Sequence, residues 1–394
     1  MRIERIEAFP VKLPRDFKAA TGTAGIPARL VGETAYRRAE NYATVYSSQV
    51  ETTLVRVTTD SGLAGWGEAQ SPVAPEVSAG VIESLLAPML TGEDALAPEY
   101  LWERMYSAMR VRGHSGGFYL DAIAGIDIAV WDVCGKAFGQ PVCRLLGGPC
   151  RADVPYYVSG LAGTGEGARL ANFQDALARG NRSFKLFVDA SAEECLSLIR
   201  AMRAQSPAGT EILVDALWRL DVPGAMRFAA ALDEQRAGWL EAPLMPEDVE
   251  GHARLAAQSP VPIAIGESYR TRFELLPFFE RRALHIVQPD LGRTGLSEAR
   301  KIASLAEAFH VSVAPHVSTG LGPQIAAALH FAAACPNLRI LECNPKVYDV
   351  ANRFLQTPLT MTAARLAPPQ GTGLGIEVKL QELEPFTRKG NHLL

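Results

Sequence analysis

After Gly147-Gly148-Pro149, one pattern repeats to about residue 345: a short apolar run typical of a buried strand, then a segment with the apolar spacing of an amphipathic helix. This alternation favours parallel strands that are joined and covered by helices. Eight such repeats predict a TIM-type barrel. The expected strands are 154–158, 183–188, 211–214, 238–241, 262–266, 283–287, 311–314 and 338–341.

An ionisable residue stands near the end of each expected strand from the second to the eighth, within the strand or up to three residues after it. In order along the chain they are Lys185, Asp215, Glu241, Glu267, Asp290, His316 and Glu342. Four of the intervals between them are 26 residues long, as one strand-and-helix unit per residue would require. Catalytic groups of such barrels lie at the carboxyl ends of the strands. A single carboxylate after a strand would most simply be a solvated surface residue, whereas seven groups in register predict one site.

The three carboxylates Asp215, Glu241 and Glu267 follow three consecutive strands, so we expect them to converge on one point. Without a cation they would repel one another strongly. Ligation by oxygen alone, without histidine or cysteine, favours Mg²⁺ over zinc, with Mn²⁺ as a substitute. We therefore predict a divalent-metal site with open positions for a substrate carboxylate.

The pair Asp290 and His316 follows two neighbouring strands and is predicted to be hydrogen-bonded. An aspartate in this position fixes the tautomer of the imidazole and raises its basicity. A lone histidine after a strand is more often structural, but this one shares a ring with the predicted metal site. His316 is therefore the predicted general base.

Several segments around these residues resemble the mandelate racemase branch of the enolase superfamily. The segment 124–131 (AGIDIAVW), with Gly135-Lys136 and 145–148 (LLGG), resembles that family where it leads into the barrel. The later segments 239–243 (WLEAP), 265–267 (IGE), 288–290 (QPD) and 369–378 (PQGTGLGIEV) also match. Taken together these motifs are specific, and they span most of the chain.

The resemblance implies an α/β fold: a modified TIM (β/α)7β barrel with an α+β capping domain built from the N-terminal segment and the C-terminal tail. The expected parts are the cap at 1–125, the catalytic barrel at 126–350 and the returning tail at 351–394. The cap begins with a predicted hairpin that joins 51–58 to 63–69. By similarity, Asp215, Glu241 and Glu267 are the metal ligands, His316 with Asp290 is the base dyad, and Glu342 is a hydrogen-bonding acid near the substrate carboxylate.

The chain departs from the family pattern at two positions. The racemases carry Lys-x-Lys on the second strand, and the second lysine is the base on the face opposite the histidine. Here 183–187 (SFKLF) keeps Lys185 but has Phe187 in place of that lysine. The usual Asp-x-Asn at the metal reads Asp215-Ala216-Leu217, followed by Trp218, so we expect Trp218 to contribute to different substrate contacts.

The reaction follows from this one-sided arrangement. Removing a proton alpha to a carboxylate gives a dianionic enediolate, and Mg²⁺ with Lys185 would place positive charge where it develops. Racemisation usually needs groups on both faces, whereas elimination of a β-hydroxyl can run with His316 alone, because the protonated imidazole can return its proton to the leaving oxygen. We predict an acid-sugar dehydratase, a hydro-lyase that forms a 2-keto-3-deoxy acid. An epimerase, a racemase or a lactone cycloisomerase on the same scaffold is the alternative.

The segment 15–48 is long, polar and weakly periodic, and a loop of this size is more often functional than idle. Most of its basic and tyrosine residues would be solvated, but Arg15, Lys18 and Tyr46 are candidates for substrate contacts from a lid. The expected substrates are small-molecule carboxylic acids: hexaric acids such as galactarate first, then hexonic acids such as galactonate.

Composition excludes several other classes of protein. The formal net charge of -4 argues against a nucleic-acid partner. The 6 cysteines form no CxxC pair and no zinc spacing, so we expect reduced thiols. The chain shows neither a signal-peptide core nor a run long enough to span a membrane, so we expect no membrane partner and a cytoplasmic location. A homo-oligomer is expected. A noncatalytic barrel would have lost a metal carboxylate or the dyad, and all are present.

Overall fold

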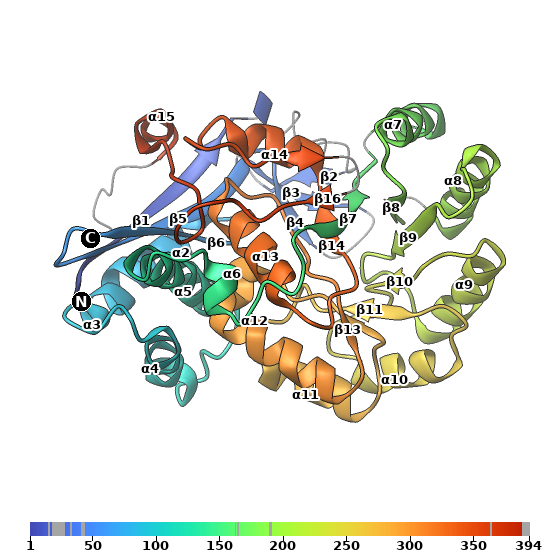
Figure 1. Cartoon of the computed structure of the whole chain (residues 1–394). Coiled ribbons are helices and arrows are strands. Elements are labelled where there is room, and N and C mark those ends of the chain that lie inside the picture. Colours follow the sequence, from blue (N-terminus) through green and yellow to red (C-terminus); the bar gives the residue numbers. More distant parts are fainter. Residues whose placement is uncertain are drawn as a thin grey trace.

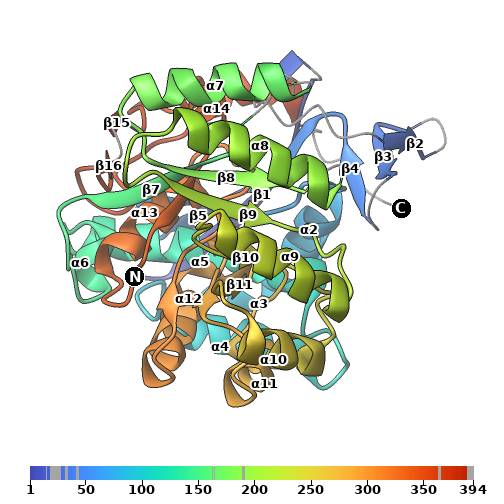
Figure 2. The same ribbon diagram turned by 90° about the vertical axis from the view of Figure 1, so that its right-hand side faces the viewer.

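The computed structural model describes residues 1–14, 16–17, 28–31, 34–40, 44–161, 163, 165–188, 191–362 and 365–387. Figure 1 shows the sheet of β1 (Ile3–Leu13), β5 (Val50–Thr59) and β6 (Ala64–Ala69) on the left and an arc of helices, α7 to α11, along the right and lower edge. Strands β8 to β13 lie inside that arc. In the view of Figure 2, helices α7, α8 and α9 lie in front of the strands and cover them.

The central sheet is parallel, with the strand order β13-β12-β11-β10-β9-β8-β7, and β14 returns beside β7. Its strands are β7 (Val154–Ser159), β8 (Ser183–Phe187), β9 (Glu211–Asp215), β10 (Leu240–Glu241), β11 (Ile263–Ile265), β12 (Ile286–Val287), β13 (Ser312–Val313) and β14 (Leu341–Cys343). Strands β13 and β14, at the two ends of this order, are connected less regularly. Val313 forms a single bridge to Leu338, and the Glu342 N–H donates to the Pro315 carbonyl. The expected α/β fold with a parallel sheet is confirmed.

The last strand was misplaced by the sequence analysis. The run 338–341 was expected, but the strand lies at 341–343, so Glu342 is part of it and does not follow it. The expected run is mostly apolar and begins at the bridge residue Leu338, so its pattern is typical of a buried strand.

Four of the helices between the strands, α8 to α11, begin at capping side chains that accept hydrogen bonds from free N–H groups of the first turn. Ser191, Asp221, Asp248 and Thr271 have this role, and Thr271 forms a full capping box with Glu274. The helices are α7 (Glu166–Ala178), α8 (Ala192–Gln205), α9 (Val222–Glu234), α10 (Val249–Gln258), α11 (Arg272–Glu280), α12 (Leu291–Ala308), α13 (Pro323–Ala334) and α14 (Pro345–Asn352).

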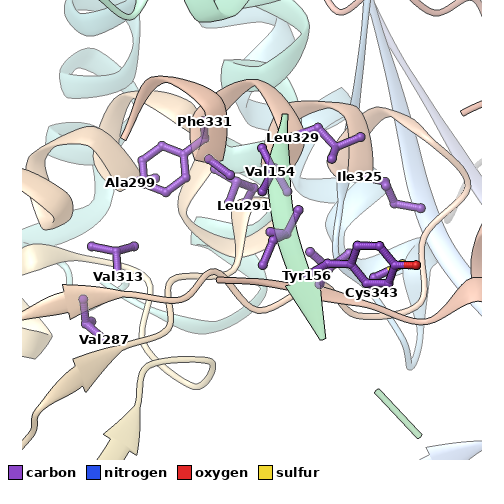
Figure 3. Packing of buried hydrophobic residues seen from close by; sticks show 14 of the residues in the cluster. Val154, Tyr156, Val287, Leu291, Ala299, Val313, Ile325, Leu329, Phe331 and Cys343 are labelled. Carbon is purple, nitrogen blue, oxygen red and sulfur yellow. The ribbon is translucent and has the colours of Figure 1, made fainter. Parts of the chain in front are cut away.

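Side chains alternate between two cores along each strand, as the two-residue period of a strand requires. One core lies inside the ring of strands and contains Leu213, Trp239 and Ile286. The neighbouring residues Val214 and Val287 belong to the large core between the strands and the helices. Figure 3 shows part of that core, where side chains of β7 and of helix α13 pack together.

The N-terminal part is an antiparallel sheet in the order β1-β5-β6, as the predicted hairpin requires. Its elements are β1 (Ile3–Leu13), β5 (Val50–Thr59), β6 (Ala64–Ala69), α2 (Pro75–Val81), the π-helical turn η1 (Ile82–Leu86), α3 (Ala87–Leu90) and α4 (Pro98–Arg110). A smaller sheet contains β2 (Ala28–Leu30), β3 (Tyr36–Ala39) and β4 (Val45–Ser47).

Helix α5 (Gly117–Ala137) joins the N-terminal sheet to the barrel strands and is buried almost all round. A side chain at Gly67 of β6 would lie 1.9 Å from the Gly125 carbonyl, so only glycine permits this close approach of strand and helix. The short helix α6 (Val142–Leu145) follows. The boundary expected at residue 125 falls inside α5, so the two parts of the chain share this helix.

The C-terminal tail contacts both parts. Its elements are β15 (Met361–Thr362), β16 (Arg365–Leu366), α15 (Leu380–Leu383) and the 3₁₀ turn η2 (Glu384–Phe386). Strand β16 pairs with β7, the Leu374 N–H donates to Asp132 of α5, and Thr387 bridges to Val11 of β1. No helix in the described part of the chain has both the length and the apolar character needed to cross a membrane.

Candidate active site

The ends of adjacent strands bring the predicted residues together in one ring. In the strand register, Asp215 lies beside Glu241, and Asp290 is bridged to His316. Lys185, Asp215, Glu241, Asp290 and Glu342 are each at most 3% exposed. Such burial of charged groups is tolerated only when they are paired or bind an ion.

The three carboxylates predicted to bind a metal converge. Asp215, Glu241 and Glu267 each offer a carboxylate oxygen, and these oxygens all lie within 4.8 Å of one another. Burial and the charge of Glu241 raise the pKa of Asp215 well above its ordinary range. A divalent cation would relieve this crowding of negative charge, and a set of three carboxylates suits a hard ion such as Mg²⁺. The residues therefore fit the predicted metal.

Lys185 lies at the centre of the carboxylates. Its ammonium is 2.8 Å from Glu241 Oε1, 3.0 Å from Glu342 Oε1 and 3.6 Å from Asp215 Oδ2. Burial alone would lower the pKa of Lys185, but Glu241 and Glu342 raise it well above its ordinary value. In this arrangement Lys185 is a cation, suited to electrostatic support of an anion.

His316 is held from both ring nitrogens. Its Nδ1–H donates to Asp290 Oδ2 at 2.6 Å, and Asp290 Oδ1 accepts the Gly292 N–H at the start of α12. The other nitrogen, Nε2, is 2.9 Å from Glu267 Oε2. Burial alone would lower the pKa of His316, whereas Glu342, Glu267 and Asp290 raise it well above its ordinary value. The predicted dyad therefore has the geometry of an oriented imidazole whose Nε2 faces Glu267, one of the predicted metal ligands.

Glu342 accepts hydrogen bonds in this structure. The Val317 N–H donates to its Oε2 at 3.1 Å, and Lys185 pairs with its Oε1. Burial would raise the pKa of Glu342, but the charges of Lys185 and His316 lower it below the ordinary value. The role of a hydrogen-bonding acid, which the resemblance implies, stays a prediction that requires a proton on this carboxyl.

Of the predicted substrate contacts, two lie in the described part of the chain. The Trp218 indole N–H lies 3.4 Å from Glu267 Oε1, and its backbone adopts a left-handed φ of 58°. Tyr46 is on β4, where burial and the charges of Asp215 and Glu267 raise the pKa of its hydroxyl. Trp218 thus contacts one of the predicted metal ligands, and Tyr46 lies within the electrostatic influence of two of them. Arg15 and Lys18 lie outside the described residues.

Two family models match the chain over most of its length. Residues 29–147 match the N-terminal domain of the mandelate racemase / muconate lactonizing enzyme family, and residues 168–383 match the enolase C-terminal domain-like family. The chain belongs to the enolase superfamily, in its mandelate racemase branch. The resemblance inferred from the sequence motifs is confirmed.

Relatives of this enolase-superfamily chain include two that are each 34% identical to it. One is D-galactarolactone cycloisomerase of Agrobacterium fabrum, matched over 84% of this chain and 90% of that protein. The other is D-galactonate dehydratase of Ralstonia nicotianae, matched over 82% and 88%. Among solved structures, a member of the enolase superfamily from Agrobacterium tumefaciens has a TM-score of 0.92 at 31% identity, covering 98% of this chain and 99% of that one.

Sequence reasoning singled out Phe187 and Trp218 beside this superfamily site but missed Tyr157 and Trp239. The Lys185 ammonium lies over the rings of Tyr157 and Phe187, 5.6 and 5.3 Å from their centroids. The Trp239 indole N–H donates to Glu241 Oε2 at 3.1 Å. The signal for Trp239 was its position two residues before Glu241, because alternate residues of a strand share a face.

Proposed function

We propose that this chain is a Mg²⁺-dependent acid-sugar dehydratase, with Mn²⁺ as a possible substitute for the metal. Its three metal ligands are Asp215, Glu241 and Glu267, and its base is His316, held by Asp290. The observation that carries the proposal is the meeting of the carboxylate group with the His316–Asp290 pair around one buried lysine.

The proposed reaction begins at the carbon next to the substrate carboxylate. His316 removes the C2 proton through Nε2, while Asp290 holds Nδ1–H and stabilises the imidazolium that forms. Bound Mg²⁺ would supply positive charge for the enediolate dianion. Lys185 adds a fixed ammonium beside it, and Glu342 holds that ammonium in place.

Elimination completes the reaction. The imidazolium of His316 returns the proton to the C3 hydroxyl, which leaves as water, so one water is lost in total and an enol remains. Ketonisation of the enol gives the 2-keto-3-deoxy acid. Trp218, which contacts Glu267, and Tyr46 on β4 are proposed to contact the substrate, and Arg15 and Lys18 remain candidates for the same role.

The architecture proposed for this function is a closed (β/α)7β barrel at 126–350, capped by 1–125 and by the tail at 351–394. The bridge from Thr387 to Val11 of β1 supports a tail that returns to the cap, and the pairing of β16 with β7 ties the same tail to the barrel. A homo-oligomer is proposed as well, and light scattering coupled to size-exclusion chromatography tests it.

The test is a panel of sugar acids incubated with the purified protein and Mg²⁺, with detection of 2-keto-3-deoxy products. Hexonic acids such as galactonate and hexaric acids such as galactarate belong in the panel, because a relative is named D-galactonate dehydratase. We expect a keto product with Mg²⁺ and none after chelation. Full turnover in the chelator would contradict the proposal.

A lactone cycloisomerase is the second candidate, favoured by the match to D-galactarolactone cycloisomerase. It would use the same base and the same enediolate but would open a lactone ring. Galactarolactone in the same panel separates the two candidates. Consumption of the lactone without any reaction of the open-chain acids would favour the cycloisomerase.

A further inference from the structure

The buried indole of Trp239 lies directly beneath the metal carboxylates. Trp239 is 0% exposed and belongs to the core inside the ring of strands. It precedes Glu241 by two residues at strand β10, so both side chains point into the ring. The aromatic core and the carboxylate group thus meet at these two residues.

The contact between them distinguishes the two oxygens of Glu241. The Trp239 Nε1–H donates to Oε2 at 3.1 Å, whereas the Lys185 ammonium contacts Oε1 at 2.8 Å. An indole N–H is an uncharged hydrogen-bond donor that accepts nothing. It can therefore hold a carboxylate oxygen without neutralising the charge of the carboxylate. The carboxylate plane of Glu241 is fixed by this donor from the side of the core.

The indole itself has little freedom to move. Its ring packs edge-on against Tyr157, with the centroids 5.3 Å apart, and the Arg339 guanidinium lies 5.2 Å from its centroid. Arg339 is in turn paired with Glu211 at 2.8 Å. A rigid donor of this kind orients a metal ligand before the ion arrives, which lowers the cost of ordering the site.

We propose that Trp239 is a positioning residue for the metal site: its N–H holds Oε2 of Glu241 and thereby fixes how Glu241 presents oxygen to the cation. This inference rests on the proposed function, because it assumes that Glu241 is a metal ligand. The competing explanation is that Trp239 only fills the core.

The test compares Trp239→Phe with Trp66→Phe. Phenylalanine keeps an aromatic ring and removes the donor. Trp66 is a matched control, since it is 4% exposed, lies under the Arg56 guanidinium and donates its indole N–H to Glu377, away from the metal carboxylates. Mg²⁺ affinity is measured by calorimetry, and Tm is measured in chelator for each protein.

We expect Trp239→Phe to weaken Mg²⁺ binding by about 10–100-fold, as loss of an outer hydrogen bond to a metal ligand typically does. Trp66→Phe should bind Mg²⁺ like the wild type. A lower Tm in chelator with unchanged Mg²⁺ affinity would assign Trp239 to packing alone and overturn the inference. If the wild type itself binds no Mg²⁺, the proposed metal site fails first.

A second measurement does not depend on the folding of Trp239→Phe. The chain has 5 tryptophans, so the indole N–H signals of protein labelled with ¹⁵N-tryptophan are few, and Trp→Phe variants at the other four positions assign Trp239 by elimination. Addition of Mg²⁺ should shift the Trp239 signal and leave the Trp66 signal in place. An unmoved Trp239 signal at saturating Mg²⁺ would contradict the proposal.

Discussion

At the scale of single residues, the site depends on pairing charges that would be costly to bury alone. Lys185 contacts three carboxylates, and His316 contacts Asp290 and Glu267. Removing one partner of such a buried group leaves the other uncompensated. Each of these side chains therefore constrains its neighbours as well as the reaction.

His316→Asn should lower kcat by about 10²–10⁴-fold, because asparagine cannot accept the C2 proton. His310→Asn is the control, since His310 is exposed and its φ of 60° suits asparagine. The measurement is kcat with a reactive sugar acid, together with Tm to check folding. Near-normal exchange of the C2 proton in His316→Asn would transfer the role of base to Lys185.

The presence of Phe187 predicts that the C2 proton is removed from only one face of the substrate. The Phe187 ring lies beside the Lys185 ammonium, where the racemases have a second lysine. We expect one C2 epimer to react and the opposite epimer to be inert, with a solvent deuteron entering at C3. Proton NMR in heavy water with both epimers measures this. Equal processing of both epimers, or epimerised substrate without keto product, would rule out the single-base dehydratase.

At the scale of elements, buried carboxylates join the N-terminal part to the barrel helices. Helix α12 is broken at Gly295, whose φ is 68°. Directly after this break, Asp127 of α5 accepts hydrogen bonds from the Ser297 N–H and hydroxyl. Asp127 thus serves the second half of α12 as a capping residue supplied by another helix.

Asp127 should make stability depend on pH. Burial raises its pKa from 3.8 to about 6, although the hydrogen bonds from Ser297 lower it. The folded state therefore binds this proton more tightly than the unfolded state, and stability from this group falls as pH rises from about 4 to about 6, by roughly 3 kcal/mol. Asp127→Asn should remove this dependence.

The measurement for Asp127 is the free energy of unfolding in urea between pH 4.5 and pH 7, at roughly half-unit steps. The stability of the wild type relative to Asp127→Asn should fall as pH rises to about 6 and should level off above that pH. The same change at exposed Asp233 is the control and should leave the pH profile unchanged. Parallel profiles for wild type and Asp127→Asn would show that Asp127 does not titrate in this window.

At the level of the whole molecule, the predicted metal carboxylates come from three adjacent strands, β9 to β11, and contact Lys185 of β8 and His316 after β13, so a bound cation should stabilise the entire fold. A ligand present at about 100 times its Kd contributes roughly 2.7 kcal/mol to the free energy of unfolding. We expect Mg²⁺ to raise Tm by several degrees and chelator to reverse the increase. Glu241→Gln should abolish the response, whereas Glu193→Gln, at a side chain 77% exposed, should keep it. A Tm that ignores Mg²⁺ in the wild type would contradict the metal site.

The α/β class, the parallel strands, the family and the residues of the ring could all be predicted from the amino-acid sequence, because side-chain periodicity and chain order are local properties. It also predicted that Asp215, Glu241 and Glu267 converge, since parallel strands end at one edge. The roles of these three carboxylates as metal ligands and of His316 as the base remain predictions.

Which groups face one another across the ring depends on how the folded elements pack. Three contacts illustrate this. Lys185 pairs with Glu342, 157 positions away, and Asp127 caps a broken helix at Ser297, 170 positions away. In the third contact, Trp239 holds Glu241, which is only 2 positions away. The first two join elements far apart in the chain, and their distances follow from packing, which no local pattern encodes. Even for Trp239, periodicity gives the shared face, but the direction of the indole N–H is set by Tyr157 and Arg339, which contact its ring.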